Sequence, residues 1–501
     1  MRIFMLGWEF PPFIAGGLGT ACFGLTRALD RAGHEVHFVL PKAVGDAQAK
    51  HVKLLGPEAL RASITRVHEA AREEAQVAPR ADTPEVVPAP GTAQADGASD
   101  LPEVLAPFAD DLKRTKFFEV ESEITTPYPG MQGSARFRQL IEAVAKHEGL
   151  KRADQLAGMG GLSGLTSSSA RVLAKVMEEI LESIEIDESE GGAYDGNLYD
   201  EAQRYARLVA GLGVQHQFDV IHAHDWLTYQ AGMALRELTG KPLVCHVHAT
   251  EFDRSGENVN QMVYDIERAG THAADRVVTV SQLTRGILEK RYGVDPAKID
   301  VVYNGVEQDE VQPEAGARID KNDKIVLFLG RITLQKGPEY FIEAAKRVLE
   351  KVDNVKFVVA GSGDLAMKMI EQAADLGIGH KVLFTGFLRG RDVERVFKMA
   401  DCYVMPSVSE PFGIAPLEAM QNDTPVIISK QSGVSEVLTH ALKVDFWDTE
   451  EMANMIVAVM RYPPLSQTLR EHGSFELRTL TWERSAKNVV QSYGRAIADR
   501  M

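Results

Sequence analysis

The sequence predicts an α/β protein made of two doubly wound parallel-sheet domains that face a central cleft, with a partly helical or disordered insertion in the first domain. A chain of 501 residues is too long for one compact core. Apolar runs alternate with helical patterns near both ends of the chain, which indicates parallel βαβ units. A polar stretch, Glu307–Asp323, separates the two alternating regions. Ligands of such sheets bind beyond the carboxyl ends of the strands, so we expect the site in the cleft.

The first domain opens with a βαβ unit. Arg2–Gly7 is predicted as a strand, Thr20–Ala32 as a helix and Glu35–Leu40 as the next strand. Gly33 follows the helix where a C-terminal cap is expected.

The alternation stops between residues 45 and 200, which we interpret as an insertion in the first domain. Ala70–Pro102 is rich in Ala, Pro, Asp and Glu, a composition typical of linkers and surface loops. Residues 134–190 have helical patterns, but Met159–Ala170 reads MGGLSGLTSSSA. These glycines follow no strand and match no dinucleotide-binding fingerprint, so a loop is predicted there.

The α/β pattern resumes at Phe218 and continues to the end of the chain. Strands of the first domain are predicted at FDVIHA, PLVCHVH, RVVTVS and IDVVYNG, and strands of the second at KIVLFLG, VKFVVAG, KVLFTG, CYVMPS and TPVIIS. The predicted domains are therefore residues 1–310 and 320–480. Residues 481–501 follow as a C-terminal helix, with helical periodicity over Trp482–Ala498.

Composition narrows the class of protein. Hydrophobic residues make up 45% and charged residues 25%, as in ordinary soluble domains. A formal net charge of −16 argues against a nucleic-acid partner. Three separated cysteines, Cys22, Cys245 and Cys402, fit a reducing compartment. The amino-terminal residues do not resemble a signal peptide and no run approaches the roughly 20 apolar residues of a membrane span, so we expect a cytoplasmic protein without a transmembrane segment.

Two motifs suit the binding of phosphates. AGGLGT, Ala15–Thr20, places Gly16, Gly17 and Gly19 between the first strand and its helix, where the backbone can approach a phosphate at the helix N-terminus. A tight turn without a ligand is the alternative. GRITLQKG places Arg331 and Lys336 after a predicted strand, where a guanidinium fork and an ammonium suit a diphosphate leaving group. Solvated surface cations are the alternative.

The motif SEPFGIAPLEAM, Ser409–Met420, contains two carboxylates, Glu410 and Glu418, with seven residues between them. Pro416 suits the first turn of a helix, so Glu410 is predicted on a loop and Glu418 within the helix. A carboxylate accepts from both hydroxyls of a ribose diol. We expect the main-chain amides of four residues to point at the sugar or phosphates from this helix N-terminus, namely those of Phe412, Gly413, Ile414 and Ala415. The alternative is one helix-capping charge and one surface charge.

Two strand ends are rich in histidine, HAHDW (His222–Trp226) and HVHATE (His246–Glu251). Strand alternation puts His246 and His248 on one face, but no third ligand is evident, so no metal site is predicted. His248 ends its strand at the cleft, where it suits a hydrogen bond to a sugar hydroxyl. His222 and His246 are assigned to the core or to supporting positions. The chain contains no Asp-x-Asp triplet, so a metal-bridged diphosphate is not indicated.

Together these motifs resemble glycosyltransferase family 4, with glycogen and starch synthases as close relatives. The matching pieces also include VSQLTR, VYNGVE and SGVSEVL, and they cover both domains in order over about 300 residues, outside the insertion. The resemblance implies a GT-B fold of two Rossmann-like domains. It also implies that Trp482–Ala498 crosses back to the first domain.

The resemblance also implies roles for single residues. Gly16, Gly17 and Gly19 would line the diphosphate, and Arg331 and Lys336 would stabilise the departing nucleotide. The sugar-side roles fall to Glu410 at the hexose, Glu418 at the ribose, His248 near the hexose 6-hydroxyl, and Asp225 near the same site.

The implied activity is retaining transfer of a hexose, glucose by this resemblance, from a UDP- or ADP-sugar to a carbohydrate acceptor such as an α-glucan, without a metal cofactor. One departure weakens the glucan synthase assignment. Bacterial glycogen synthases carry a lysine just before the paired glycines, whereas this chain has Phe13, Ile14 and Ala15. The alternatives are transfer of another hexose to a lipid or cell-wall acceptor, a nucleotide-sugar epimerase, and a non-catalytic sugar-sensing or scaffold protein.

Overall fold

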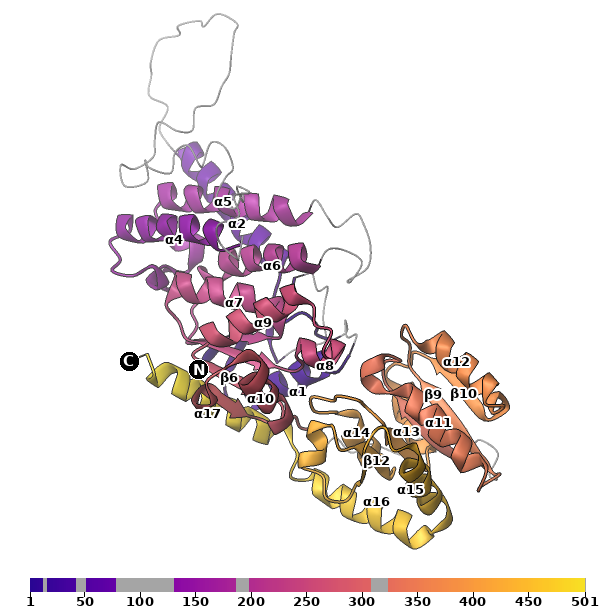
Figure 1. The fold of residues 1–501 in the computed structure, drawn as a ribbon. Helices are drawn as coiled ribbons and strands as arrows, with labels where there is room; N and C mark the ends of the chain where they lie inside the picture. Colours follow the sequence, from indigo (N-terminus) through magenta and orange to yellow (C-terminus); the bar gives the residue numbers. More distant parts are fainter. Residues whose placement is uncertain (12–15, 42–50, 78–129, 186–197, 308–322, 501) are drawn as a thin grey trace, which may run out of the picture.

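A computed structural model of the chain describes residues 1–11, 16–41, 51–77, 130–185, 198–307 and 323–500. These residues form two lobes, each built on a parallel sheet with helices on its faces (Figure 1). The predicted fold class is therefore confirmed. Residues 78–102 of the predicted loop and residues 308–322 of the predicted linker lie outside the described ranges.

The sheet of the first lobe has the strand order β3-β2-β1-β4-β5-β6-β7, and every paired neighbour is parallel. The order reverses between β1 and β4, and in sheets of this kind ligands bind beyond the carboxyl ends of the strands at such a reversal. The strands are β1 (Arg2–Leu6), β2 (Glu35–Val39), β3 (Lys53–Leu55), β4 (Val220–His224), β5 (Leu243–Val247), β6 (Arg276–Thr279) and β7 (Ile299–Val301).

Helices cover both faces of this sheet (Figure 1). They are α1 (Gly17–Arg31), α2 (Pro57–Val77), α4 (Gly130–His147), α5 (Ser167–Glu185), α6 (Leu198–Gly213), α7 (Trp226–Thr239), α8 (Glu251–Ser255), α9 (Gln261–Ala273) and α10 (Gln282–Ile287). Alternation along β1 divides the core, because Phe4 and Leu6 face one cluster of buried side chains while Ile3 and Met5 face another.

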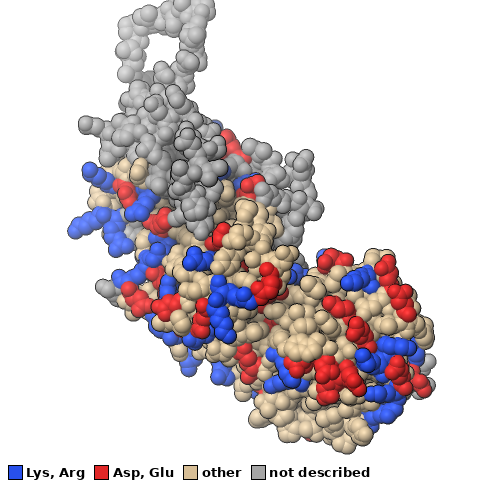
Figure 2. All heavy atoms as spheres, viewed as in Figure 1, with Lys and Arg blue, Asp and Glu red and all other residues tan. Residues whose placement is uncertain are grey.

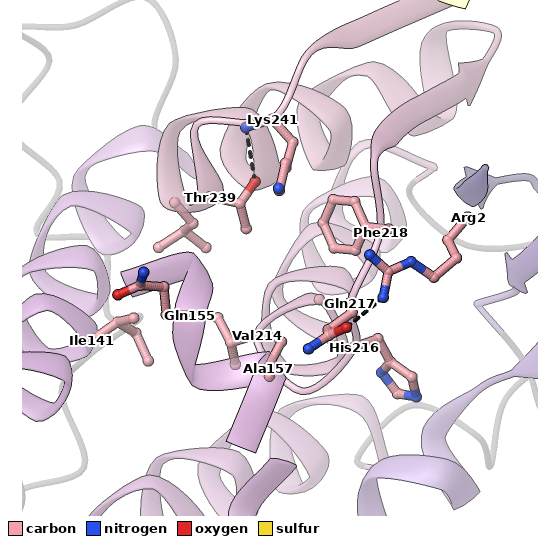
Figure 3. A pocket seen from close by; sticks show the side chains of 13 residues that line it. Arg2, Ile141, Gln155, Ala157, Val214, His216, Gln217, Phe218, Thr239 and Lys241 are labelled. Carbon is pink, nitrogen blue, oxygen red and sulfur yellow. Dashed lines mark hydrogen bonds between the residues drawn. The ribbon is translucent and has the colours of Figure 1, made fainter. Parts of the chain in front are cut away.

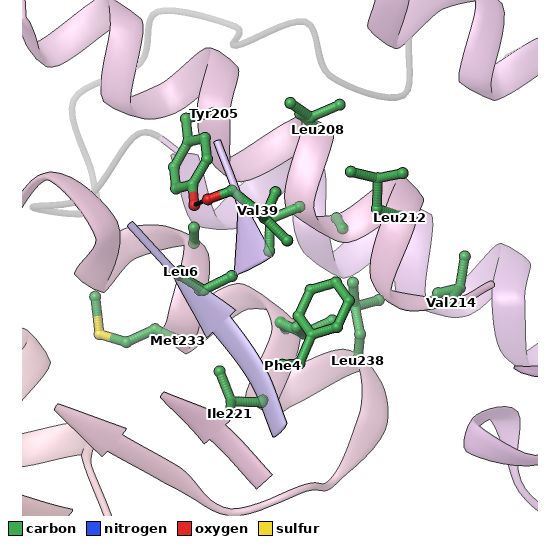
Figure 4. Close-up of a cluster of buried hydrophobic side chains, with 14 of the residues drawn as sticks. Phe4, Leu6, Val39, Tyr205, Leu208, Leu212, Val214, Ile221, Met233 and Leu238 are labelled. Atoms are coloured by element: carbon green, nitrogen blue, oxygen red, sulfur yellow. Dashed lines mark hydrogen bonds between the residues drawn. The ribbon is translucent and has the colours of Figure 1, made fainter. Parts of the chain in front are cut away.

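The stretch predicted as an insertion contributes to the core of the first lobe. Lys53–Leu55 forms an edge strand that the sequence did not reveal, because three residues are too few to show a period. Helices α2, α4 and α5 bury apolar side chains in one cluster with Phe4 and Leu6, and Tyr205 of α6 donates a hydrogen bond to the Val39 carbonyl at 2.9 Å (Figure 4).

The Gly/Ser patch predicted as a loop instead forms two short 3₁₀ helices, Ala153–Met159 and Gly161–Gly164, before α5 begins at Ser167. Gly160 and Gly161 have positive φ angles of 90° and 72°, which reverse the chain between the two turns.

The sheet of the second lobe has the order β10-β9-β8-β11-β12-β13, again parallel, with its reversal between β8 and β11. Its strands are β8 (Lys324–Leu329), β9 (Val355–Ala360), β10 (Val382–Gly386), β11 (Cys402–Met405), β12 (Val426–Ser429) and β13 (Leu442–Val444). Its helices are α11 (Pro338–Leu349), α12 (Ala366–Asp375), α13 (Arg391–Met399), α14 (Ala415–Gln421), α15 (Thr449–Arg461) and α16 (Pro463–Leu477). The short strand β13 escaped the sequence analysis for the same reason as β3.

The chain passes between the lobes at two places that lie side by side. Val306, near the end of the first lobe, forms a parallel bridge with Thr481, and its N–H donates to the Leu480 carbonyl at 3.0 Å. Helix α17 (Trp482–Ala498) then packs on α1, β5 and β6 (Figure 1). A Cβ atom at Gly24 of α1 would lie 2.2 Å from the Trp482 ring, so only glycine permits this close approach.

The surface carries both signs of charge. Figure 2 shows lysines and arginines interspersed with aspartates and glutamates over both lobes on the face in view. Among the described helices, none is long and apolar enough to cross a membrane.

Candidate active site

Loops at the carboxyl ends of the two sheets meet where the lobes touch. Ser409, which follows β11, donates a hydrogen bond from its Oγ to Oδ1 of Asp253 in α8 at 2.6 Å. Helix α8 also packs against the 3₁₀ turn Leu334–Lys336 of the second lobe. The segments that carry Lys336 and Glu410 therefore adjoin the loop that follows His248.

Lys336 and Glu410 form an ion pair in which Lys336 Nζ donates to Glu410 Oε2. Ser407 Oγ donates to the same oxygen at 3.3 Å. Glu410 is only 7% exposed, and a buried carboxylate is costly to bring into the fold unless a cation and hydrogen bonds contact it. The structure thus brings together two of the predicted site residues, which lie 74 positions apart in the sequence.

The loop around Glu410 is held by main-chain bonds. The Glu410 N–H donates to the Gln431 carbonyl at 3.0 Å, and the Glu410 carbonyl accepts from the Gly433 N–H at 2.9 Å. Gly413 has a φ of 98°, and a Cβ atom there would lie 3.1 Å from Cγ of Glu410. A side chain at position 413 would therefore both strain the backbone and press on the catalytic candidate.

Helix α14 begins at Ala415 with Pro416 in its first turn, so the predicted loop position of Glu410 and helical position of Glu418 are confirmed. Phe412 is buried, and its ring lies 6.1 Å from the Tyr303 ring of the first lobe. Ile414 caps the helix without a side-chain hydrogen bond. Glu418 is partly buried, and burial raises the pKa of its carboxyl to about 7.

This raised pKa predicts that donor binding strengthens as the pH rises. Below about pH 7 the Glu418 carboxyl is protonated and offers fewer acceptor lone pairs to a ribose diol. We expect the donor KM to fall between pH 6 and pH 8 in the native chain and to be flat in Glu418→Gln. The exposed Glu394→Gln in α13 is the matched control. Equal pH dependence of the donor KM in Glu418→Gln and the native chain would contradict this role.

Three of the four remaining phosphate-binding candidates are open to solvent. Arg331 is exposed just beyond β8, and Gly16 and Gly17 are exposed at the N-terminus of α1. A Cβ atom at Gly16 or Gly17 would meet no atom within 4 Å, so packing of the described residues does not require glycine there. Gly19 is buried within α1, and Ala15 lies outside the described residues.

Asp225 joins the end of β4 to the loop after β5. Its Oδ1 accepts the main-chain N–H of His248 at 2.7 Å and that of Ala249 at 3.4 Å. Its backbone has φ 58° and ψ 173°, a conformation in which non-glycine residues cost roughly 1–3 kcal/mol. Burial raises the pKa of the Asp225 carboxyl to about 7, although the nearby Arg254 guanidinium opposes this shift.

A network of charges that the sequence analysis missed supports this loop. Arg254 donates to Glu267 Oε1 at 2.6 Å and to the Ala249 carbonyl at 3.3 Å. Asp253 accepts both the N–H and the hydroxyl of Thr250 at 2.8 Å, which closes a capping box. The pattern Thr-Glu-Phe-Asp at positions 250–253 was the available signal, since a Thr followed three residues later by an acid marks a helix start.

The two roles of the Asp225 side chain can be separated by substitution. Asparagine keeps an acceptor oxygen for the two N–H groups, whereas alanine leaves both without a partner. We expect Asp225→Ala to lower kcat/KM for nucleotide release by about 10- to 100-fold, the equivalent of losing one or two hydrogen bonds. Asp225→Asn should retain most of the activity. If the two variants lost activity equally, the carboxylate charge rather than the acceptor geometry would be what matters.

Four histidine rings pack against one another near the carboxyl ends of β4 and β5. The sequence analysis placed two of them on one face and found no third ligand. The parallel register pairs His224 with His246, so His222 and His224 of β4 lie beside His246 and His248. Burial lowers the pKa of every one of these rings, to about 3 for His248. All four rings are therefore neutral at physiological pH.

The nitrogens of this cluster are mostly engaged in hydrogen bonds. His222 Nδ1 lies 2.5 Å from the Tyr493 hydroxyl, His222 Nε2 lies 3.2 Å from His246 Nδ1, and His224 Nδ1 lies 2.8 Å from His248 Nε2. Ring nitrogens of His222, His224 and His246 come within 4.8 Å of one another. Within this cluster, the Nε2 atoms of His224 and His246 are buried without a hydrogen-bond partner among the described residues.

A cavity of about 310 Å³ lies elsewhere, at the amino ends of β1 and β4. Figure 3 shows it between the 3₁₀ segment and the sheet, with Arg2 bonded to Gln217 at its wall. Its other polar lining residues include Gln155, His216, Thr239 and Lys241. None of the predicted site residues lines this cavity, so it is separate from the candidate active site.

Comparison with known proteins identifies the class. The sequence model described as Glycosyl transferases group 1 matches residues 312–474, Glycosyltransferase Family 4 matches residues 194–310, and Starch synthase catalytic domain matches residues 2–118. The last match extends into the stretch from residue 45, which the sequence resemblance had left out.

The chain is similar to a D-inositol 3-phosphate glycosyltransferase of a Mycobacterium species (strain JLS), with 31% identity over 62% of this chain and 75% of the relative. An uncharacterized glycosyltransferase of Methanocaldococcus jannaschii is 34% identical over 48% of this chain and 64% of its own length. The chain therefore spans slightly less than two thirds of the length of that relative.

Among solved structures, sucrose-phosphate synthase of Thermosynechococcus elongatus matches with a TM-score of 0.59 at 17% identity, over 99% of both chains. HepE of Anabaena, in complex with UDP and glucose, matches with a TM-score of 0.56 at 15% identity, also over 99% of both chains. Two facing lobes, each built on a Rossmann-like parallel sheet, form the GT-B fold. The chain belongs to the glycosyltransferases of the family 4 type, which resemble glycogen and starch synthases.

Proposed function

We propose that this glycosyltransferase moves a hexose from a nucleoside-diphosphate donor to a carbohydrate acceptor with retention of configuration. The observation that carries the proposal is the Lys336–Glu410 pair of the second lobe, placed beside the His248 loop of the first by the Ser409–Asp253 bond. We favour a donor in which glucose is linked to UDP or ADP. The names of the similar proteins support a phosphorylated or sugar acceptor and a UDP-linked donor.

In the proposed reaction most of the new negative charge develops on the departing diphosphate. Arg331 and Lys336 supply cations to it, and the exposed N-terminus of α1 at Gly16 and Gly17 supplies main-chain amides. Preorganised groups of this kind stabilise the transition state because they need not reorient during the reaction. The proposal therefore involves no metal ion.

On the sugar side, attack occurs from the face that the diphosphate leaves, through an oxocarbenium-like transition state. The departing phosphate oxygen takes the proton of the acceptor hydroxyl. Glu410 acts as a charge partner rather than a nucleophile, since Lys336 and Ser407 both bind its Oε2. Neutral His248 serves as a hydrogen-bonding group at the hexose, because its lowered pKa makes the imidazolium scarce at neutral pH.

More than one acceptor is compatible with this donor site. Transfer to a lipid or cell-wall acceptor uses the same donor site, and the D-inositol 3-phosphate relative favours including a polyol phosphate. A nucleotide-sugar epimerase would show no dependence on any acceptor. The three free, buried cysteines fit a reducing compartment, which supports a cytoplasmic site of action.

The test is release of nucleoside diphosphate from UDP-, ADP- and GDP-sugars, with glycogen, maltooligosaccharide, D-inositol 3-phosphate or no acceptor. We expect release from a glucose donor that rises with a carbohydrate acceptor and is lost in Glu410→Ala. If only D-inositol 3-phosphate stimulates release, the acceptor is a small polyol phosphate rather than a glucan. Donor binding without release in any combination would contradict a transferase and favour a sugar-sensing role.

A further inference from the structure

We propose that His224 is a positioning residue that fixes the ring and the tautomer of His248 for sugar transfer. The inference deepens the proposed function and rests on it for the role of His248. Sequence reasoning assigned His224 no role, and its place behind the site emerges only from the pairing of β4 with β5.

The contact between the two rings is short and enclosed. His224 Nδ1 lies 2.8 Å from His248 Nε2, and the His224 side chain is only 1% exposed. The ring of His224 also stacks on those of His222 at 4.3 Å and His248 at 5.1 Å between centroids. His224 therefore cannot turn without breaking several contacts, which makes it a rigid support for the partly exposed His248.

The environment of His224 Nε2 indicates which ring donates the hydrogen bond between His224 and His248. His224 Nε2 is buried and has no hydrogen-bond partner in the described chain. A buried N–H without an acceptor is rarer in proteins than a buried acceptor without a donor. The proton of His224 is therefore best placed on Nδ1, which donates to Nε2 of His248. Neutral His248 must then carry its own proton on Nδ1.

This tautomer gives His248 a defined task. With Nε2 occupied as an acceptor, its Nδ1–H is the group left to donate a hydrogen bond to a sugar or phosphate oxygen. Asp225, the residue after His224, accepts the main-chain N–H of His248 at 2.7 Å. Two consecutive residues at the end of β4 thus fix His248, one through its ring and the other through its backbone.

Three substitutions separate positioning from packing. His224→Leu removes the donor, whereas His224→Asn keeps an N–H near the position of Nδ1. His37→Asn is the matched control, because His37 is likewise a buried histidine of the first sheet, in β2, but bonds Glu35 rather than His248. We expect His224→Leu to lower kcat/KM about tenfold, the equivalent of one hydrogen bond, His224→Asn to restore most of it, and His37→Asn to change it by less than about twofold.

A double-mutant cycle with His248→Ala gives the decisive kinetic result. If His224 acts through His248, His224→Leu should change kcat/KM by less than about twofold once His248 is alanine. Tenfold losses in both backgrounds would overturn the proposal, because they would show that His224 acts independently of His248.

A spectroscopic readout does not depend on activity. Long-range ¹H–¹⁵N correlation of the imidazole rings, with His248→Ala to assign the signal, should show His248 protonated on Nδ1 in the native chain and a tautomer mixture in His224→Leu. If the native chain transfers no sugar but the His248 tautomer still differs in this way between the native chain and His224→Leu, the proposed function fails. The positioning of His248 by His224 then still stands. His248 protonated on Nε2 in the native chain would overturn the positioning role of His224. Binding of one equivalent of zinc to the native chain, lost in both His224→Asn and His246→Asn, would also overturn that role.

Discussion

Replacing Lys336 with alanine is expected to lower turnover at least a hundredfold. Lys336 is the one predicted site cation that contacts Glu410 in the described residues, and in the proposed reaction it supplies positive charge to the leaving diphosphate. Removal of one preorganised donor from such a site typically costs about 3–4 kcal/mol of activation free energy. Arg331→Ala should lose activity to a similar extent.

The measurement is kcat for nucleotide release at saturating donor, with folding checked by circular dichroism. Arg347→Ala is the matched control, since Arg347 is an exposed cation of the same lobe in the last turn of α11. Near-normal rates in both Lys336→Ala and Arg331→Ala would remove the assigned role of these cations.

Glu410→Gln is expected to reduce sugar transfer by about a hundredfold or more, for a different reason. Glutamine has nearly the shape of glutamate but carries no charge, so it loses the ion pair with Lys336. It also removes the charge that we propose lies next to the hexose. Lys336 would then lack the carboxylate that orients it, at a cost comparable to one active-site donor. Donor binding and transfer should be measured separately, by calorimetry and by product formation.

Loss of stability could imitate both results, because breaking a buried ion pair leaves one charge uncompensated at a cost of about 3–5 kcal/mol. The double variant Lys336→Met with Glu410→Gln removes both charges together. Its free energy of unfolding should lie nearer to that of the native chain than either single variant does, while its transfer rate stays low. Recovery of activity along with stability would show that the pair serves the fold rather than the reaction.

Much of the fold could be predicted because its signals are local. Buried parallel strands such as KIVLFL read as apolar runs, and Gly, Pro or polar residues mark their ends. The short edge strands β3 and β13 carry too few residues to show a period. The sequence analysis assigns the helices between residues 51 and 185 to an insertion rather than to the core. Their packing partners, among them Phe4 and Leu6, are distant in the sequence, so no local pattern reveals them.

The candidate site could be predicted only as far as motifs reach. The motifs placed Lys336 and Glu410 at strand ends, but nothing in the sequence indicated their ion pair. The bond between Ser409 and Asp253 joins residues 156 positions apart, and the bond between His224 and His248 depends on the register of β4 against β5. Such contacts follow from tertiary structure, so sequence alone could not give them.

The most direct test of the central claim is proton NMR of the reaction as it proceeds, with the α-linked nucleotide sugar and the acceptor that best stimulates release. We expect a new glycoside with the α configuration at its anomeric carbon from its first appearance, formed in step with release of the nucleoside diphosphate. A β-linked product would contradict retention. Free sugar alone, with the acceptor unchanged, would contradict transfer itself.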